Sequence, residues 1–360
     1  MISWRRLTSV AGLAAGAAAA GAGVVIAAEK IAVGRIRLRP DPAAAEPLGQ
    51  LHGRSLTVLA SDGAALHAEI SGPDDAPVTI IFSHGYALSQ DVWHYQRAAL
   101  AGQRVVCWDQ RGHGRSSRAG TDRVTVDQLG ADLHAVLTAT VPGDGPVVLV
   151  GHSMGGMTIM ALADQHPELF GSKVIGIVLI STAAAGVDPT AWLPAPLRPA
   201  ARQVAPAMLR GASLSRPASM IERGRHAAGD LAFLGTRFMA FGDPQVSPAI
   251  VDYLERIIRA TPVTVIADFY LALLGHDKLS ALPVLGRVPV VVLIGDSDRV
   301  VPARFGEQVA AAIPGADLLR VPGAGHALIL ERPALASEVI SELTSRALAR
   351  SKSRGHGEPA

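Results

Sequence analysis

The chain has 360 residues, of which 49% are hydrophobic and 18% are charged, so it can form one large domain with an insertion or two modest domains. The formal net charge is only +2, and the basic residues are scattered singly or in pairs, which excludes an obvious nucleic-acid-binding surface. The single cysteine, Cys107, excludes an internal disulfide, and its position in the apolar run 105–108 predicts a buried, inert thiol.

The N-terminal segment differs from the rest of the chain. Arg5 and Arg6 precede an uncharged stretch rich in alanine and glycine at residues 7–28. As a helix this stretch would be about 33 Å long, which matches a hydrocarbon core of about 30 Å. We therefore expect residues 1–30 to be a signal peptide or membrane anchor, so that the protein is membrane-anchored or exported. A cytoplasmic protein with an Ala/Gly-rich tail is the less favoured alternative. Residues 31–55 contain a proline-rich stretch and predict a linker.

From residue 56 onward, short apolar runs of strand type alternate with segments of helix length. This alternation predicts an α/β fold, a doubly wound and mainly parallel sheet with helices on both faces, over residues 56–348. We expect eight strands, at residues 56–60, 64–70, 78–83, 105–108, 147–150, 174–180, 288–294 and 317–321. Helices are expected at residues 92–101, 126–140, 154–166, 303–313 and 333–348. The polar residues 349–360 predict a disordered tail.

The interval from about residue 182 to 282 breaks this alternation. It contains prolines, scattered aromatic residues and helical pieces such as 249–259, but no convincing strand. A long helical insertion between two sheet strands predicts a cap over the carboxyl edge of the sheet, where open α/β sheets bind ligands. An independent second domain is the alternative, which we disfavour because strand-helix alternation resumes at residue 288.

Residues 151–155 have the sequence Gly-His-Ser-Met-Gly. A β-branched apolar run precedes them and a helix-compatible segment follows, so the pattern predicts a strand, a sharp turn and a helix. Such a turn pushes the side chain of Ser153 out of the path of the chain, and its strained backbone leaves no room for β carbons at Gly151 and Gly155. The motif therefore predicts that Ser153 is an exposed nucleophile.

A serine hydroxyl needs a base within hydrogen-bond reach, usually a histidine held by a carboxylate. The strand expected at 288–294 runs into Asp296 and Asp298, and the strand expected at 317–321 runs into His326. Parallel strands bring their carboxyl ends to one edge of a sheet, so we expect these groups at the same edge as Ser153. Their order along the chain is Ser, Asp, His.

Two further motifs follow expected strands: Ser-His-Gly-Tyr at residues 83–86, and Asp-Gln-Arg-Gly-His-Gly-Arg-Ser at residues 109–116. With these motifs, the serine turn and the Asp298 and His326 turns, the sequence from about 56 to 348 resembles the α/β-hydrolase superfamily. Within the superfamily it resembles serine esterase- and lipase-like members with a helical cap, and their non-haem haloperoxidase-like relatives. A single five-residue motif would be weak evidence, whereas four motifs in this order are specific.

The resemblance implies that Ser153 is the nucleophile, His326 the general base and then acid, and Asp298 the carboxylate that fixes the tautomer of the imidazole. In the family pattern the acid stands four residues before a proline, as Asp298 does before Pro302, and Asp296 is the rival.

By the same resemblance, the backbone N–H groups of Tyr86 and Met154 are the oxyanion donors. Three further motif histidines, His84, His113 and His152, are interpreted as structural, and Asp109 and Arg111 as braces of the loop below the site. His276 and Asp277 lack a spaced third ligand for a metal. The sequence implies neither a nucleotide nor a metal cofactor.

The leading hypothesis is a serine hydrolase that cleaves small-molecule, hydrophobic carboxylic esters through an acyl-enzyme. The preference for hydrophobic esters is expected from apolar residues of the cap, although such residues more often form the core of a cap than contact substrate. These residues are Phe233, Leu234, Phe238, Phe241 and Tyr270. Alternatives on the same fold are a cofactor-free haloperoxidase or perhydrolase, and a thioester, amide or carbon-carbon bond hydrolase. A non-catalytic ligand-binding protein is the alternative from a different class.

Overall fold

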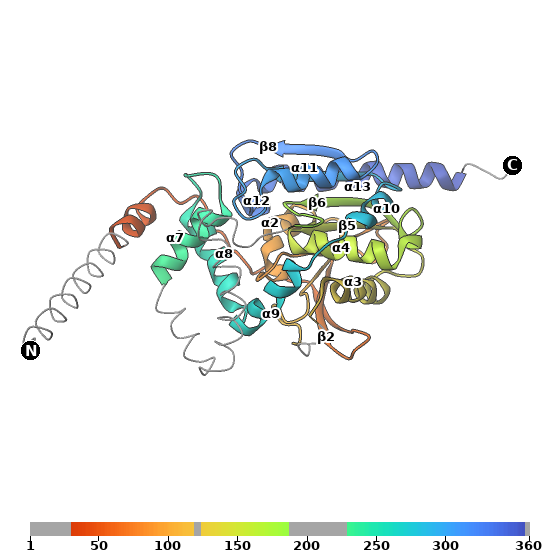
Figure 1. Ribbon diagram of the computed structural model, residues 1–360, viewed down its shortest axis with the longest axis horizontal. Helices are drawn as coiled ribbons and strands as arrows, with labels where there is room; N and C mark the ends of the chain where they lie inside the picture. The colour runs from red at the N-terminus through yellow and green to blue at the C-terminus, as the bar shows by residue number, and fades with distance from the viewer. Residues whose placement is uncertain (1–29, 119–123, 187–228, 357–360) are drawn as a thin grey trace, which may run out of the picture.

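The computed structural model describes residues 30–118, 124–186 and 229–356. The expected signal or anchor segment, apart from its last residue, and residues 187–228 of the expected cap lie outside the described residues. In the described part of the chain, a single sheet of eight strands forms the centre of the molecule, with helices packed on it (Figure 1). This arrangement confirms the predicted α/β fold class.

The strand order is β1-β2-β4-β3-β5-β6-β7-β8. β2 pairs antiparallel with β1 and β4, whereas the remaining neighbours pair parallel. Because β3 to β8 run in one direction, the loops that follow these strands meet at one edge of the sheet. The strands are β1 (Arg54–Leu59), β2 (Ala65–Ser71), β3 (Thr79–Ser83), β4 (Arg104–Trp108), β5 (Val147–His152), β6 (Val174–Ile180), β7 (Val290–Gly295) and β8 (Asp317–Val321).

The central strands are covered on both faces. Every residue of β3, β4, β5, β6 and β7 is buried, which explains why these strands are largely apolar, with polar residues only at their ends, and do not alternate. Burial also raises the pKa of the Cys107 thiol, in β4, to about 11. One apolar cluster joins the sheet to α2 (His94–Ala99) and α13 (Pro333–His356), and a second joins the opposite face to α3 (Val126–Thr140), α4 (Met154–Gln165), α10 (Leu282–Leu285) and α11 (Ala303–Ala312).

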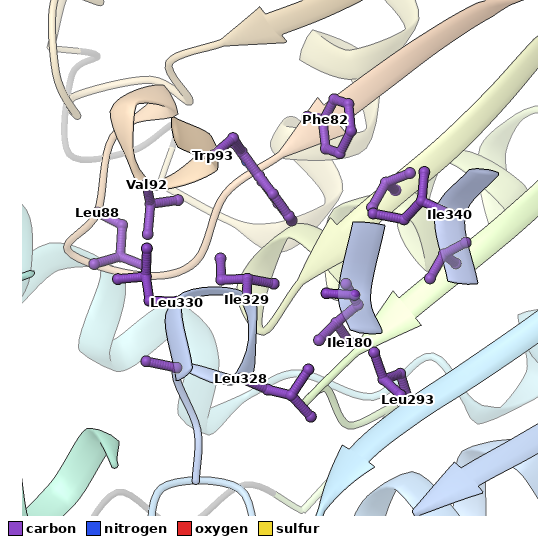
Figure 2. Packing of buried hydrophobic residues seen from close by; sticks show 14 of the residues in the cluster. Phe82, Leu88, Val92, Trp93, Ile180, Leu293, Leu328, Ile329, Leu330 and Ile340 are labelled. Atoms are coloured by element: carbon purple, nitrogen blue, oxygen red, sulfur yellow. The ribbon is translucent and has the colours of Figure 1, made fainter. Parts of the chain in front are cut away.

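The first of these clusters also fixes the loop that follows β8. This loop continues into the short helix α12 (Leu328–Glu331), all of whose residues are buried. Figure 2 shows Leu330 beside Leu88 and Val92, with Ile329 lying toward Trp93. Val92 and Trp93 belong to the 3₁₀ helix η1 (Gln90–Trp93). Apolar packing therefore joins the segment after β8 to the segment after β3 at the carboxyl edge of the sheet.

The described part of the insertion between β6 and β7 is helical. It comprises α7 (Gly229–Ala240), α8 (Pro248–Ala260) and α9 (Val263–Leu274), followed by the 3₁₀ helix η5 (Leu279–Ala281). α7, α8 and α9 lie on the same side of the molecule as the helix at residues 30–37 (Figure 1). No single helix in the described ranges is long and apolar enough to cross a membrane; α8 and α9 meet the length and composition requirements together, but they are bent by 90°.

Two predicted boundaries are wrong. The expected linker 31–55 includes a helix, residues 30–37, that packs on the cap, because Val33 and Ile36 lie on one helix face and are buried in the same cluster as Phe233. Asp41 then accepts the Ala249 N–H at 3.0 Å, at the start of α8. The expected disordered tail 349–360 is also wrong for residues 349–356, which continue α13 because no proline interrupts them; residues 357–360 lie outside the described ranges.

Candidate active site

Ser153 occupies the sharp turn between β5 and α4. Its backbone has φ 53° and ψ −118°, which a residue with a side chain rarely adopts. A β carbon at Gly151 would lie 2.6 Å from the Gly155 carbonyl, and one at Gly155 would lie 2.0 Å from the carbonyl oxygen of Ser83. Glycine at both positions is therefore a steric requirement of this turn.

Asp298 and His326 meet across the loops that follow β7 and β8. The His326 Nδ1 lies 2.9 Å from Asp298 Oδ2, and both side chains are largely buried. The second carboxylate oxygen, Oδ1, accepts the N–H groups of Val300 and Val301 at 2.8 Å each. Both oxygens of Asp298 are thus occupied, which holds the carboxylate in one orientation against the imidazole.

Asp296, the rival carboxylate, has different partners. Its Oδ1 accepts the Gly323 N–H at 2.7 Å and the Ser297 hydroxyl at 3.0 Å. It therefore joins the β7 loop to the β8 loop, and in this structure the carboxylate that contacts His326 is that of Asp298.

Ser153 and His326 both line a cavity of about 400 Å³ between the sheet edge and the cap. Tyr86 and His152 line it as well, and most of the remaining wall is apolar. Of the cap residues considered above, Tyr270 lines the cavity, whereas Phe233 and Phe241 are buried in the core and Phe238 is exposed. The apolar wall comes from both parts of the protein, including Leu88, Val92, Met157, Met239, Leu254, Ile258, Leu273, Val301 and Ile329.

The loop that contains Tyr86 passes close to Ser153 at Gly85. A β carbon at Gly85 would lie 3.2 Å from the Ser153 Cβ, so glycine there permits a close approach of the loop. Met154 is the first residue of α4, and the N–H of a first helical residue has no acceptor within its own helix. The two N–H groups named from the sequence thus belong to the two segments that flank Ser153.

Three buried histidines hold these segments, and desolvation keeps each of them neutral. It lowers the pKa of His84 to about 4 and those of His113 and His152 to about 3. His84 Nδ1 is 2.7 Å from the Gly85 carbonyl oxygen, and its Nε2 accepts the Gln110 N–H at 2.9 Å. His152 Nε2 is 2.9 Å from the His326 carbonyl oxygen. These contacts match the structural interpretation of the motif histidines.

The other polar motif residues also form hydrogen bonds or ion pairs with other residues of the chain. Asp109 accepts the Gln90 N–H at 2.8 Å and the Arg115 N–H at 3.0 Å, while Arg111 pairs with the buried Asp132. His276 Nε2 lies 3.2 Å from the Ala183 carbonyl oxygen. Among the described residues, no group of three or more His, Cys, Asp or Glu side chains could hold a metal ion.

Sequence reasoning missed Glu331. Its Oε1 accepts the Gly242 N–H at 3.0 Å, and its Oε2 accepts the Gly325 N–H, next to His326, at 2.6 Å. One buried carboxylate thus joins the histidine loop to the segment after α7. The available signal was a lone acidic residue directly after an apolar run, five positions beyond His326.

The comparison with protein-family models gives a match to the alpha/beta hydrolase fold over residues 78–333. The chain belongs to the α/β-hydrolase fold family. The matched range covers most of the sheet, the described cap helices, and Ser153, Asp298 and His326. The family predicted from the four motifs is therefore confirmed.

Relatives of this α/β-hydrolase include an AB hydrolase superfamily protein, YfhM, of Bacillus subtilis, which is 26% identical over 289 residues, 78% of this chain and 95% of that protein. A 3-oxoadipate enol-lactonase of Acinetobacter baylyi is 28% identical over 80% of this chain and 96% of the enzyme. Among solved structures, an enol-lactonase from Burkholderia xenovorans has a TM-score of 0.64 at 24% identity, and covers 81% of this chain and 100% of that chain. At that identity the structural likeness establishes the fold. These relatives support a hydrolase enzyme.

Proposed function

We propose that this α/β-hydrolase is a serine esterase that cleaves carboxylic esters with apolar groups through an acyl-enzyme. The observation that carries the proposal is the 2.9 Å contact between His326 Nδ1 and Asp298 Oδ2, at the same cavity that Ser153 lines. A carboxylate on Nδ1 keeps the proton on that nitrogen, so Nε2 is free to accept the proton of the serine hydroxyl.

In the proposed acylation step, Ser153 Oγ attacks the ester carbonyl carbon while His326 Nε2 takes the hydroxyl proton. The negative charge that develops on the carbonyl oxygen is stabilised by the N–H groups of Tyr86 and Met154, each contributing about 3 to 4 kcal/mol. His326 then gives its proton to the leaving alkoxide, which departs as an alcohol.

In the proposed deacylation step, His326 Nε2 removes a proton from water, and the resulting hydroxide attacks the acyl carbon. The same two N–H groups stabilise the second oxyanion. When it collapses, the carboxylic acid leaves and His326 returns the proton to Ser153 Oγ. Asp298 stabilises the imidazolium in both steps without taking a proton itself.

The proposed substrate class rests on the cavity wall. Burying apolar groups against it stabilises the complex by about 25 cal/mol per Å² of apolar surface removed from water. A volume of about 400 Å³ fits a small-molecule ester. We therefore expect esters with an apolar acyl or alcohol group to be preferred over charged esters.

The test is a fluorophosphonate probe together with a series of p-nitrophenyl esters of increasing acyl length, on the full chain and on Ser153→Ala. We expect labelling and turnover in the wild type and neither in the variant, with a clear optimum of acyl length. Absence of labelling and turnover in the folded wild-type protein would favour a non-catalytic binding protein.

Perhydrolysis is a second candidate, because peroxide can intercept the same acyl-enzyme. A relative from Acinetobacter calcoaceticus named as a bifunctional esterase/perhydrolase is 38% identical over 126 residues, which is 34% of this chain and 43% of that enzyme. Adding hydrogen peroxide to the ester assay and measuring peracid distinguishes the two activities.

We also propose that residues 1–30 anchor the protein to a membrane or direct its export. The uncharged stretch at residues 7–28 supports this proposal by its length and composition. Cell fractionation of the full chain should place it in the membrane or exported fraction, and an intact N-terminus in the soluble cytoplasmic fraction would contradict it.

A further inference from the structure

The loop that carries the Tyr86 N–H is hydrogen-bonded to the cap at two consecutive residues. The Tyr86 hydroxyl donates to the carbonyl oxygen of Ile266 in α9. The Thr261 hydroxyl, between α8 and α9, donates to the Ala87 carbonyl oxygen at 3.1 Å. We name this pair of hydrogen bonds the cap clasp.

The clasp acts on a strained backbone. Ala87 has φ 59°, a left-handed conformation that alanine disfavours and that persists only where surrounding contacts impose it. Its N–H donates to His113 Nε2 at 3.2 Å, on the sheet side, and its carbonyl accepts from Thr261, on the cap side. The peptide groups next to the proposed oxyanion donor are therefore held from both sides.

The same cap helix contacts the second proposed donor segment. Val265 and Phe269 of α9 are buried in one apolar cluster with Met154 and Met157 of α4, and Tyr86 packs against that cluster. The position of α9 thus bears on both segments that flank Ser153.

We propose that Tyr86, through its hydroxyl, and Thr261 are positioning residues that orient the Tyr86 N–H from the cap, so that the oxyanion hole is complete only when these two hydrogen bonds are formed. This inference rests on the proposed function. An oxyanion donor that is preorganised in this way acts on the transition state and not on the bound substrate.

Three variants of the full chain test the clasp: Tyr86→Phe, which keeps the ring in the cavity wall, Thr261→Val, which keeps the side-chain volume, and Thr261→Ser, which keeps the hydroxyl. Matched controls remove similar hydrogen bonds elsewhere. Tyr253→Phe removes a hydroxyl group that donates from α8 to the Asp91 carbonyl oxygen and takes no part in the clasp. Thr140→Val removes a buried hydroxyl group that donates to a backbone carbonyl oxygen within α3.

We expect Tyr86→Phe and Thr261→Val each to lower kcat about tenfold at unchanged KM. Complete removal of an oxyanion donor lowers kcat more, by about 10²- to 10³-fold. Affinity for a boronic acid that mimics the tetrahedral intermediate should fall by the same factor as kcat/KM. Thr261→Ser should retain wild-type kcat, as should both control variants, at temperatures where circular dichroism shows all variants folded.

Unchanged kcat and boronic acid affinity in both clasp variants would overturn the inference. So would an equal loss in Tyr253→Phe, because that result would assign the effect to general seating of the cap. Wild-type protein that neither labels with fluorophosphonate nor turns over esters would refute the proposed function itself, so the two failures are distinguishable.

Discussion

Replacing Asp298 with asparagine tests whether the carboxylate fixes the tautomer of His326, because the substitution preserves most of the other hydrogen bonds at this position. The asparagine carbonyl oxygen can still accept the N–H groups of Val300 and Val301, which Asp298 Oδ1 accepts at 2.8 Å each. The amide NH₂ then faces His326 Nδ1, at the place of the oxygen that now lies 2.9 Å away.

Two N–H donors cannot share that contact, so we expect His326 in Asp298→Asn to carry its proton on Nε2 and accept at Nδ1. In this tautomer Nε2 cannot take the proton of Ser153. The expected loss in kcat is about 10⁴-fold, or about 5.4 kcal/mol at about 1.36 kcal/mol per factor of ten. Stability should change little, because a neutral amide replaces the carboxylate without emptying the site.

The assay is steady-state hydrolysis of the preferred p-nitrophenyl ester, with urea unfolding to verify the fold. Asp296→Asn is the matched control, since Asp296 joins two loops and does not contact His326. Activity of Asp298→Asn within tenfold of wild type, or an equal loss in Asp296→Asn, would refute the assignment.

Three other predictions concern the frame around the site. Gly155→Ala should prevent formation of the serine turn, because its β carbon would lie 2.0 Å from the Ser83 carbonyl oxygen. Expression level and far-ultraviolet circular dichroism would reveal the misfolded product, and a folded, active variant would contradict the steric argument. Glu331→Gln should lower the free energy of unfolding by about 1 to 3 kcal/mol, because an NH₂ group would face a backbone N–H that the carboxylate now accepts; urea titration measures the change, and no change would show that the contact is unimportant. Desolvation raises the pKa of Glu69, but the Gly53 N–H and the Arg97 guanidinium outweigh it and lower the pKa from 4.5 to about 2. The ionised carboxylate therefore contributes to the free energy of unfolding above pH 4.5, and this contribution is lost as the pH falls toward 2. Glu69→Gln should flatten the dependence of the free energy of unfolding on pH in that range.

The fold was predictable because its signals are local. The all-buried strands have uninterrupted apolar centres, and each of the eight expected strands overlaps an observed one. The wrong boundary near the N-terminus depended on distant contacts. The helix at residues 30–37 is stabilised by packing on α7, some 200 residues away, which a scan for proline and glycine does not register.

The candidate site shows the same division. Ser153 could be located from five consecutive residues, because the strain of its turn requires glycine at neighbouring positions. Glu331 could not be assigned a role, because its partners, Gly242 and Gly325, are recognisable only once the cap lies against the β8 loop.

The sequence by itself determined the fold family, the serine turn and the order of the candidate nucleophile, acid and base, because these depend on residues next to one another in the chain. The tertiary structure decided which aspartate contacts His326, how the cap is hydrogen-bonded to the Tyr86 loop, and where the apolar cavity lies. These features depend on side-chain contacts between strands and helices far apart in sequence. They are set by how the elements pack together, and no local pattern encodes that packing.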